Sequence, residues 1–250
     1  MHRLGLSLLA LLLGPLVLLA ATSAPATAAG AWKGAPQVGD CYKLTWKQVQ
    51  RASVPVDPVA CSKGHQAVVL RTGLLDADTD WDDTDAVAHA IARRCATAAD
   101  PWTTDDPRVS YRTMYLPLIF WPTAAQRARG ARWYRCDLAL QGTGEALAQL
   151  PEKLVKVTSS NVSRRTRRSV TRCVTSEYLY TLCDRTHAYR GTGTFVAKKL
   201  SKRTAKAQRQ VRARAVDRCP ALTSTDDWIY SSQAVTARSR VVLCYSRLSR

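Results

Sequence analysis

The eight cysteines of this 250-residue chain constrain its fold more than any other feature, because they repeat one pattern. Each half holds four cysteines, and the second of each four begins a Cys-x-x-x-His motif, ending at His65 in one half and His187 in the other. The next cysteine follows 34 residues later in the first half and 36 residues later in the second. The two groups are Cys41, Cys61, Cys95, Cys136 and Cys173, Cys183, Cys219, Cys244. This shared order predicts a tandem repeat of one module.

The segments between the cysteines predict the same elements in both halves. Strands are expected after each histidine, at 67–75 and 189–197, and around the last cysteine of each group. Apolar residues four apart predict a helix ending at the third cysteine of each group: Val87, Ile91, Cys95 and Val211, Ala215, Cys219. Thr84 and Ser201 are the predicted N-caps, with Pro101 beyond the end of the first helix. The predicted fold class is α+β, with two tandem disulfide-stapled modules, each a small antiparallel sheet packed on one helix.

The cysteines are expected to form disulfides, since an even number in an exported chain is typical of a cystine framework. We expect the first to pair with the second and the third with the fourth in each group, which would staple helix to sheet. Four cysteines allow three connectivities, and the sequence leaves all three open.

The N-terminus predicts export. Met1-His2-Arg3 precedes the apolar run of residues 4–21, and Ala26-Thr27-Ala28 fits a signal peptidase site. The expected location is therefore secreted or extracytoplasmic, in the cell envelope. An uncleaved anchor helix is the alternative, and it would bring membrane contact. The predicted organisation is a signal peptide over 1–29, module 1 over 36–142, a linker over 143–165 and a basic module 2 over 166–250.

Three segments of the first half carry a family resemblance. They are Val38-Gly39-Asp40-Cys41-Tyr42, the run of residues 59–69 around Cys61 and His65, and Pro122 through Gly130-Ala131-Arg132 to Cys136. Together they resemble the septum formation domain family of actinobacterial exported and membrane-anchored proteins, over residues of about 38–140. Residues of about 165–250 resemble a degenerate second copy, since no Gly-Asp precedes Cys173. The resemblance implies an envelope protein linked to septation and implies no known reaction.

Positive charge is concentrated in the second half. The chain has a net charge of +18; residues 30–150 hold 14 Lys and Arg against 13 Asp and Glu, and residues 151–250 hold 22 against 6. This favours an anion-binding surface, with a solvated Arg-rich surface as the alternative. The expected partners are anionic envelope polymers, lipid headgroups or an envelope protein; the charge also suits nucleic acid, but export opposes it. The candidate polyanion-binding residues are Arg164, Arg165, Arg167, Arg168, Lys202, Lys206 and Arg209.

Catalytic and metal chemistry has little support in the sequence. A Cys–His nucleophile or a zinc site at the Cys-x-x-x-His motifs would need free thiolates, so His65 and His187 are predicted to hydrogen-bond the turn after a disulfide. The acidic run of residues 76–85 has Trp81 and Val87 where a calcium loop needs Gly and Glu. No cofactor or metal is expected.

The aromatic residues of the first half leave two interpretations open. They would form core and strand packing, or they would line a groove for a ligand such as a sugar: Tyr111, Tyr115, Trp121, Trp133 and Tyr134. The predicted function is a non-enzymatic envelope protein that binds polyanions or a protein partner. The alternative is a secreted enzyme acting on cell-wall polymers through a site that no motif shows.

Overall fold

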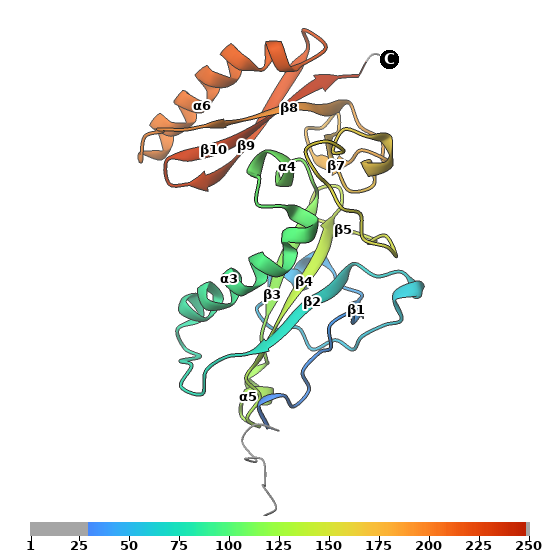
Figure 1. The fold of residues 1–250 in the computed structure, drawn as a ribbon, viewed down its shortest axis with the longest axis vertical. Coiled ribbons are helices and arrows are strands. Elements are labelled where there is room, and N and C mark those ends of the chain that lie inside the picture. The colour runs from blue at the N-terminus through green and yellow to red at the C-terminus, as the bar shows by residue number, and fades with distance from the viewer. Residues whose placement is uncertain (1–29, 249–250) are drawn as a thin grey trace, which may run out of the picture.

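A computed structural model describes residues 30–248 of the chain. The predicted signal peptide, residues 1–29, lies outside the described residues. Within them, two five-stranded antiparallel sheets each pack against one long helix (Figure 1). The predicted fold class is confirmed: this is an α+β fold of two disulfide-stapled modules.

The first sheet has the strand order β1-β2-β4-β3, with β5 pairing on β4. Its helix α3 contributes the buried residues Val87, Ile91 and Cys95, at the spacing that the sequence predicted. Its strands are β1 (Cys41–Tyr42), β2 (Ala67–Leu74), β3 (Tyr115–Phe120), β4 (Trp133–Gln141) and β5 (Leu147–Ala148), and its helices are α2 (Trp46–Val49), η1 (Cys61–Lys63), α3 (Thr84–Thr103), α4 (Pro107–Ser110) and α5 (Ala124–Arg127).

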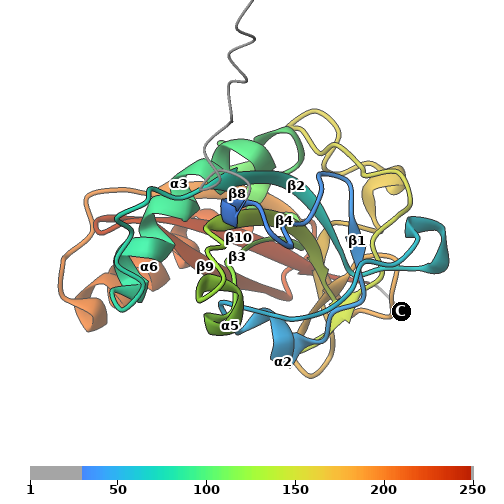
Figure 2. The same cartoon turned by 90° about the horizontal axis from the view of Figure 1, so that it is seen from below.

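The second sheet repeats this order as β6-β8-β10-β9, with β7 added outside β6. Its strands are β6 (Arg172–Val174), β7 (Tyr180–Leu182), β8 (Tyr189–Ala197), β9 (Trp228–Thr236) and β10 (Ser239–Arg247), and its helices are η2 (Arg165–Arg167), α6 (Thr204–Arg218) and η3 (Pro220–Leu222). In both modules the long helix comes between two pairs of matching strands, β1 and β2 before β3 and β4 in the first and β6 and β8 before β9 and β10 in the second. The first module adds β5 after its second pair, and the second adds β7 between β6 and β8 along the chain. The long helices α3 and α6 extend toward the same side of the molecule in two perpendicular views (Figures 1 and 2).

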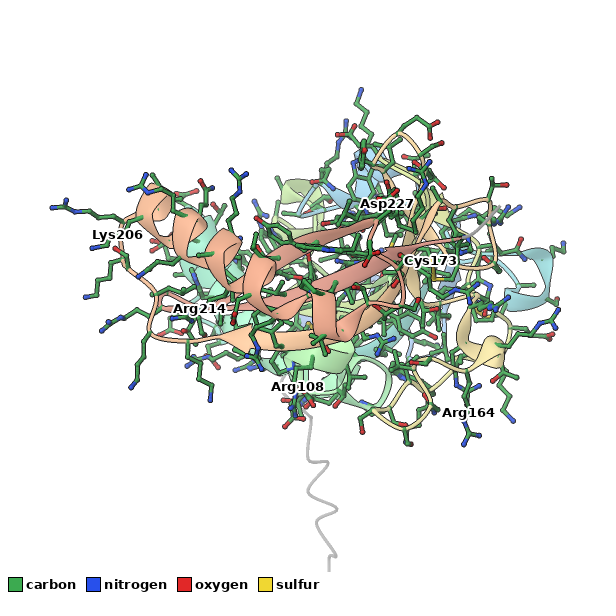
Figure 3. The ribbon with its side chains drawn as sticks, turned by 90° about the horizontal axis from the view of Figure 1, so that it is seen from above. Arg108, Arg164, Cys173, Lys206, Arg214 and Asp227 are labelled. Atoms are coloured by element: carbon green, nitrogen blue, oxygen red, sulfur yellow. A yellow bond between two sulfur atoms is a disulfide. The ribbon has the colours of Figure 1, made fainter. Side chains whose placement is uncertain are left out.

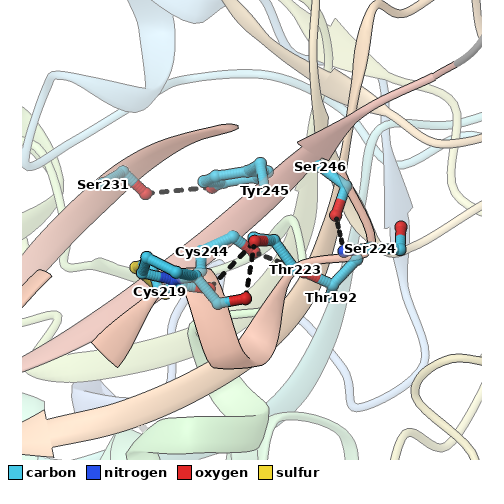
Figure 4. Close-up of a disulfide and its surroundings, with 9 residues drawn as sticks. Thr192, Cys219, Thr223, Ser224, Ser231, Cys244, Tyr245 and Ser246 are labelled. Carbon is cyan, nitrogen blue, oxygen red and sulfur yellow. Dashed lines mark hydrogen bonds between the residues drawn. A yellow bond between two sulfur atoms is a disulfide. The ribbon is translucent and has the colours of Figure 1, made fainter. Parts of the chain in front are cut away.

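The disulfides join the pairs that we expected. Cys41 bonds to Cys61 and Cys173 to Cys183, which ties the first strand of each module to the following loop. Cys95–Cys136 fixes α3 to β4, and Cys219–Cys244 fixes the end of α6 to β10 (Figure 4). All eight cysteines form disulfides, and none is free. None of them therefore offers a thiolate that could act as a nucleophile or bind zinc in this structure.

Both predicted N-caps are wrong. Helix α3 begins at Thr84, and the preceding residue Asp83 caps it by accepting a hydrogen bond from Ala86 N at 2.9 Å. Helix α6 begins at Thr204 behind Arg203, and Ser201 instead accepts from Arg203 N at 3.1 Å. A carboxylate also interacts well with the positive end of a helix dipole, which favours Asp83 over the threonine beside it.

Helix α3 does not stop before Pro101 but continues through it to Thr103. A proline beyond the first turn removes the backbone donor that would bond to the carbonyl four residues earlier, so it disfavours continuing a helix. Here the turn is closed by other groups, since Thr103 Oγ1 donates to Ala99 O at 3.1 Å and Thr104 N to Asp100 O at 2.9 Å. Trp102 therefore lies in the helix rather than after it.

The two modules share one core at their junction. A cluster of buried apolar residues includes Met114 and Leu138 from the first module, Leu150 from the segment predicted as a linker, and Val170 and Leu182 beyond it. A backbone bridge between Thr113 and Thr171 joins the two halves, and it is flanked by bonds from Met114 N to Val170 O and from Arg172 N to Arg112 O, both 2.8 Å. The predicted module boundaries stay a prediction.

Candidate functional site

The predicted polyanion-binding residues fall into two separate groups. Arg164, Arg165, Arg167 and Arg168 lie on and around η2, whereas Lys202, Lys206 and Arg209 lie on and just before α6. Lys206 and Arg164 stand on opposite sides of the view in Figure 3. The structure therefore does not bring the seven residues into one surface.

The α6 group is a solvent-facing cationic surface. The helix buries Ala207, Val211 and Ala215 against its sheet, which leaves Lys206 and Arg209 exposed on the outer side. The ion pairs found within residues 30–248 include none from α6, so these cations have no carboxylate partner there. This arrangement attracts anions over a distance and offers no shaped site.

The η2 group borders a small cavity at the junction of the modules. Arg164 and Arg168 line it together with Arg112, which follows α4, Arg172 of β6 and Arg190 of β8. Its volume is about 40 Å³, and the remaining lining consists of Val162, Ser163, Thr171, Cys183 and Gly191. Within the described chain, no carboxylate lines this cavity. We call it the five-arginine cavity.

Two of these arginines are held by contacts from both modules. The Arg172 guanidinium lies over the rings of Tyr111 at 4.4 Å and Tyr180 at 4.6 Å, and Nη2 donates to Thr113 O at 3.2 Å. Arg112 Nη2 donates to Ser163 Oγ at 3.0 Å and to Gly191 O at 3.1 Å. These contacts fix where the two positive charges lie.

The charges in the five-arginine cavity are poorly compensated. Burial lowers the pKa of Arg112, because a charged group loses hydration. Burial also lowers the pKa of Arg190, and the nearby positive charge of Arg168 lowers it further. The Nε atoms of Arg172 and Arg190 are buried without a hydrogen-bond partner in the described chain. The cavity therefore holds a concentration of positive charge with few compensating contacts in the described chain.

A larger cavity of about 600 Å³ lies in the first module, which we call the first-module cavity. Trp121 and Trp133 line this cavity, as the ligand-groove interpretation expected. The three tyrosines instead pack in the apolar cores, as the core-packing interpretation expected: Tyr111, Tyr115 and Tyr134. Its polar lining includes Asp40, Asp57, Gln126 and Arg135.

Arg135 at this cavity belongs to a buried ion pair. Its Nε lies 3.3 Å from Asp137 Oδ2, and its guanidinium lies over the rings of Tyr42 at 4.1 Å and Phe120 at 4.6 Å. Burial raises the pKa of Asp137 to about 6, although the charge of Arg135 opposes the rise. Arg135 Nη2 is buried without a partner in residues 30–248. Arg135 and Asp137 stand two residues apart in an otherwise mostly apolar strand, and this pattern is the sequence signal that indicates the pair.

The two motif histidines contact the loops that follow their cysteines. His65 is buried, with Nδ1 2.9 Å from Cys61 O, and His187 Nδ1 lies 2.6 Å from Arg185 O. Their structural role stays a prediction. Across residues 30–248, no three His, Cys, Asp or Glu side chains come close enough together to hold a metal ion. None of the helices in the same range combines the length and the apolar character needed to cross a bilayer.

Comparisons with known proteins give one match. No curated protein and no solved structure matches the chain. The sequence model described as septum formation matches residues 113–248, more than half of the chain. The match covers β3, β4, β5 and the described part of the second module. It includes the Pro122-to-Cys136 segment of the resemblance and lies C-terminal to the other two segments, around Cys41 and around Cys61 and His65. The chain belongs to the septum formation family.

Proposed function

We propose that this protein is a non-enzymatic, exported cell-envelope protein that acts in septation by binding polyanions through its second module. Membership of the septum formation family indicates a role related to cell division, and the family is not known as an enzyme family. The four disulfides fit an extracytoplasmic location.

The observation that carries the proposal is the uncompensated charge of α6. Residues 151–250 contain 22 basic and 6 acidic residues, and Lys206 and Arg209 of α6 are exposed without ion pairs in the described chain (Figure 3). A surface of this kind concentrates anionic polymers near it, and the attraction weakens as salt rises.

Binding to a long polyphosphate, measured at several salt concentrations, tests the proposal. The triple variant Lys202→Glu, Lys206→Glu, Arg209→Glu should bind at least about tenfold more weakly, because each replacement turns attraction into repulsion. The matched control is Lys43→Glu, Lys47→Glu, Lys63→Glu, which reverses three exposed charges on the first module. Equal weakening in both variants would show that net charge alone, and not α6, governs binding.

A second candidate function rests on the first-module cavity. Indole rings beside carboxylate, amide and guanidinium groups suit a sugar, whose ring faces are apolar and whose hydroxyls both donate and accept. This favours binding of, or action on, a neutral wall saccharide, with Trp121, Trp133, Asp57 and Arg135 in contact. Soluble wall fragments should then bind, and Asp57→Asn should weaken them while leaving polyphosphate binding intact. Release of new reducing ends would identify an enzyme.

A further inference from the structure

We infer that the five-arginine cavity binds a single phosphate group of an envelope component at the junction of the two modules. This inference rests on the proposed polyanion-binding function and assigns a ligand chemistry to one place within it. The group would be a phosphate ester, carried either by a wall polymer or by a lipid headgroup.

The size of the cavity fits one small anion. Its volume is about 40 Å³, and a water-sized group needs roughly 10–15 Å³ of such space. There is room for the free oxygens of one phosphate group but not for a sugar ring, so the rest of a polymer or lipid would stay outside. The exposed Arg164 stands at this border, where it can contact the emerging chain.

The charge of the cavity favours phosphate. Five guanidinium groups line it with no carboxylate among the described lining residues. Inorganic phosphate and phosphate monoesters carry about −1.5 to −2 charges and three acceptor oxygens. A phosphodiester keeps about one negative charge and two free oxygens, and guanidinium donors match such oxygens in pairs. The buried Nε groups of Arg172 and Arg190 lack hydrogen-bond partners in the described chain, which adds to the uncompensated positive charge around the cavity.

The position of the cavity links the ligand to the module junction. Arg112 comes from the first module, Arg172 and Arg190 come from the second, and Arg164 and Arg168 come from the segment between β5 and β6. An anion held by all three parts neutralises like charges that repel one another in the empty cavity. Binding should therefore stabilise the folded protein.

Thermal unfolding of the disulfide-bonded protein in inorganic phosphate, sulfate or chloride at constant ionic strength tests the inference. Phosphate should raise the Tm in proportion to the logarithm of its concentration once this exceeds the Kd, by about 5–10 °C at one hundred times its Kd. Sulfate should act more weakly, and chloride should leave the Tm unchanged. An equal response to all three anions would overturn the assignment of a phosphate site.

Replacing one arginine of the cavity should weaken phosphate binding without lowering the Tm, whereas replacing an arginine with a purely structural role should lower the Tm. Arg168→Gln and Arg190→Gln should each weaken phosphate binding at least about tenfold, while the Tm without phosphate stays the same or rises, because one repelling charge is gone. The matched control is Arg129→Gln, an exposed arginine of the first module that does not line the cavity, and it should respond as the unchanged protein does. Full phosphate response in both cavity variants would refute the site.

Competition experiments distinguish a wall polymer from a lipid as the source of the phosphate group. The α6 variant distinguishes the cavity site from the proposed polyanion-binding surface. Polyglycerol phosphate or vesicles containing phosphatidylglycerol should displace inorganic phosphate, and the competitor that succeeds identifies a wall polymer or a lipid. Failure of both would overturn a phosphate group of the envelope as the ligand. The triple α6 variant should keep its phosphate response, so loss of polyphosphate binding there and loss of the response in Arg190→Gln test different sites.

Discussion

Arg172 lies with its guanidinium 4.4 Å from the ring of Tyr111, although the two residues belong to different modules. Tyr180 lies at 4.6 Å from the same guanidinium, so Arg172 contacts two aromatic rings. Stacking of this kind holds a cation in place while leaving its in-plane donors free. The pair therefore joins the modules and positions a charge of the five-arginine cavity at the same time.

Replacing Tyr111 by Phe should show how much the hydroxyl contributes to this junction. Tyr111 Oη donates to Ser231 Oγ at 2.9 Å and lies 3.3 Å from Tyr180 Oη. The ring and its contact with Arg172 remain in Tyr111→Phe, but Ser231 loses a partner. We expect the free energy of unfolding to fall by about 1–2 kcal/mol in denaturant titration. Tyr178→Phe, at an exposed tyrosine, is the control and should change it little.

Removing disulfides should cost more for the helix-to-sheet bond than for the shortest loop. Cys95–Cys136 closes a separation of 41 residues and Cys173–Cys183 one of 10. Loop entropy then gives about 4 kcal/mol for the first and about 3 kcal/mol for the second. Cys95→Ala with Cys136→Ala should therefore unfold at lower denaturant than Cys173→Ala with Cys183→Ala. The reverse order would mean that packing around the shorter loop outweighs chain entropy.

Asp137 should make stability fall as pH rises from about 4 to 6. Its pKa is raised to about 6 in the folded protein by burial, against about 3.9 in an unfolded chain. Between these values the folded state binds more protons, so the free energy of unfolding decreases with pH, by on the order of 3 kcal/mol in total. Below pH 4 Asp137 is protonated in both the folded and the unfolded state. Above pH 6 it is charged in both, and the full loss of stability from burying that charge is present.

The variant Asp137→Asn isolates this contribution. It does not titrate, so the difference in stability between the unchanged protein and the variant should narrow or reverse as pH rises through 4–6. Urea titrations of both proteins at pH 3.5, 5 and 7 measure it. A constant difference across this range would show that the ion pair with Arg135 holds Asp137 charged in the folded state.

The N-terminus of α3 offers a test between neighbouring residues. Asp83 accepts the capping bond from Ala86 N, and Thr84 is already helical. Asp83→Ala should lower the free energy of unfolding by about 1 kcal/mol. Thr84→Ala, the control, should leave it nearly unchanged or raise it slightly, since alanine favours helix. A larger decrease in the free energy of unfolding in Thr84→Ala than in Asp83→Ala would show that Thr84, the residue predicted from the sequence, is the N-cap.

Much of the fold could be predicted because its signals are local. Helix α6 follows from the four-residue spacing of Val211, Ala215 and Cys219, and the pairing of Cys219 with Cys244 follows from a helix end that lies over a closing strand. The path of α3 through Pro101 could not be predicted, because the turn after the proline is held by bonds from Thr103 Oγ1 to Ala99 O and from Thr104 N to Asp100 O. Those bonds depend on geometry rather than on residue type.

Only part of the five-arginine cavity could be predicted from the sequence. Arg164 and Arg168 stand in an obvious basic run, but Arg112 and Arg190 are isolated residues in unrelated segments. They meet because the Thr113–Thr171 bridge aligns the start of β3 with the start of β6. No periodicity within either segment encodes that meeting, so long-range pairing alone creates the site.

The bond between Cys95 and Cys136 has a practical consequence for the family to which this chain belongs. The matched residues 113–248 contain Cys136, Cys173, Cys183, Cys219 and Cys244, an odd number, and the partner of Cys136 precedes the match. A fragment cut at those limits would carry an orphan thiol on β4 and would lack the neighbouring strand β2. The stretch that matches the family is therefore shorter than the stretch that the disulfides of this protein close.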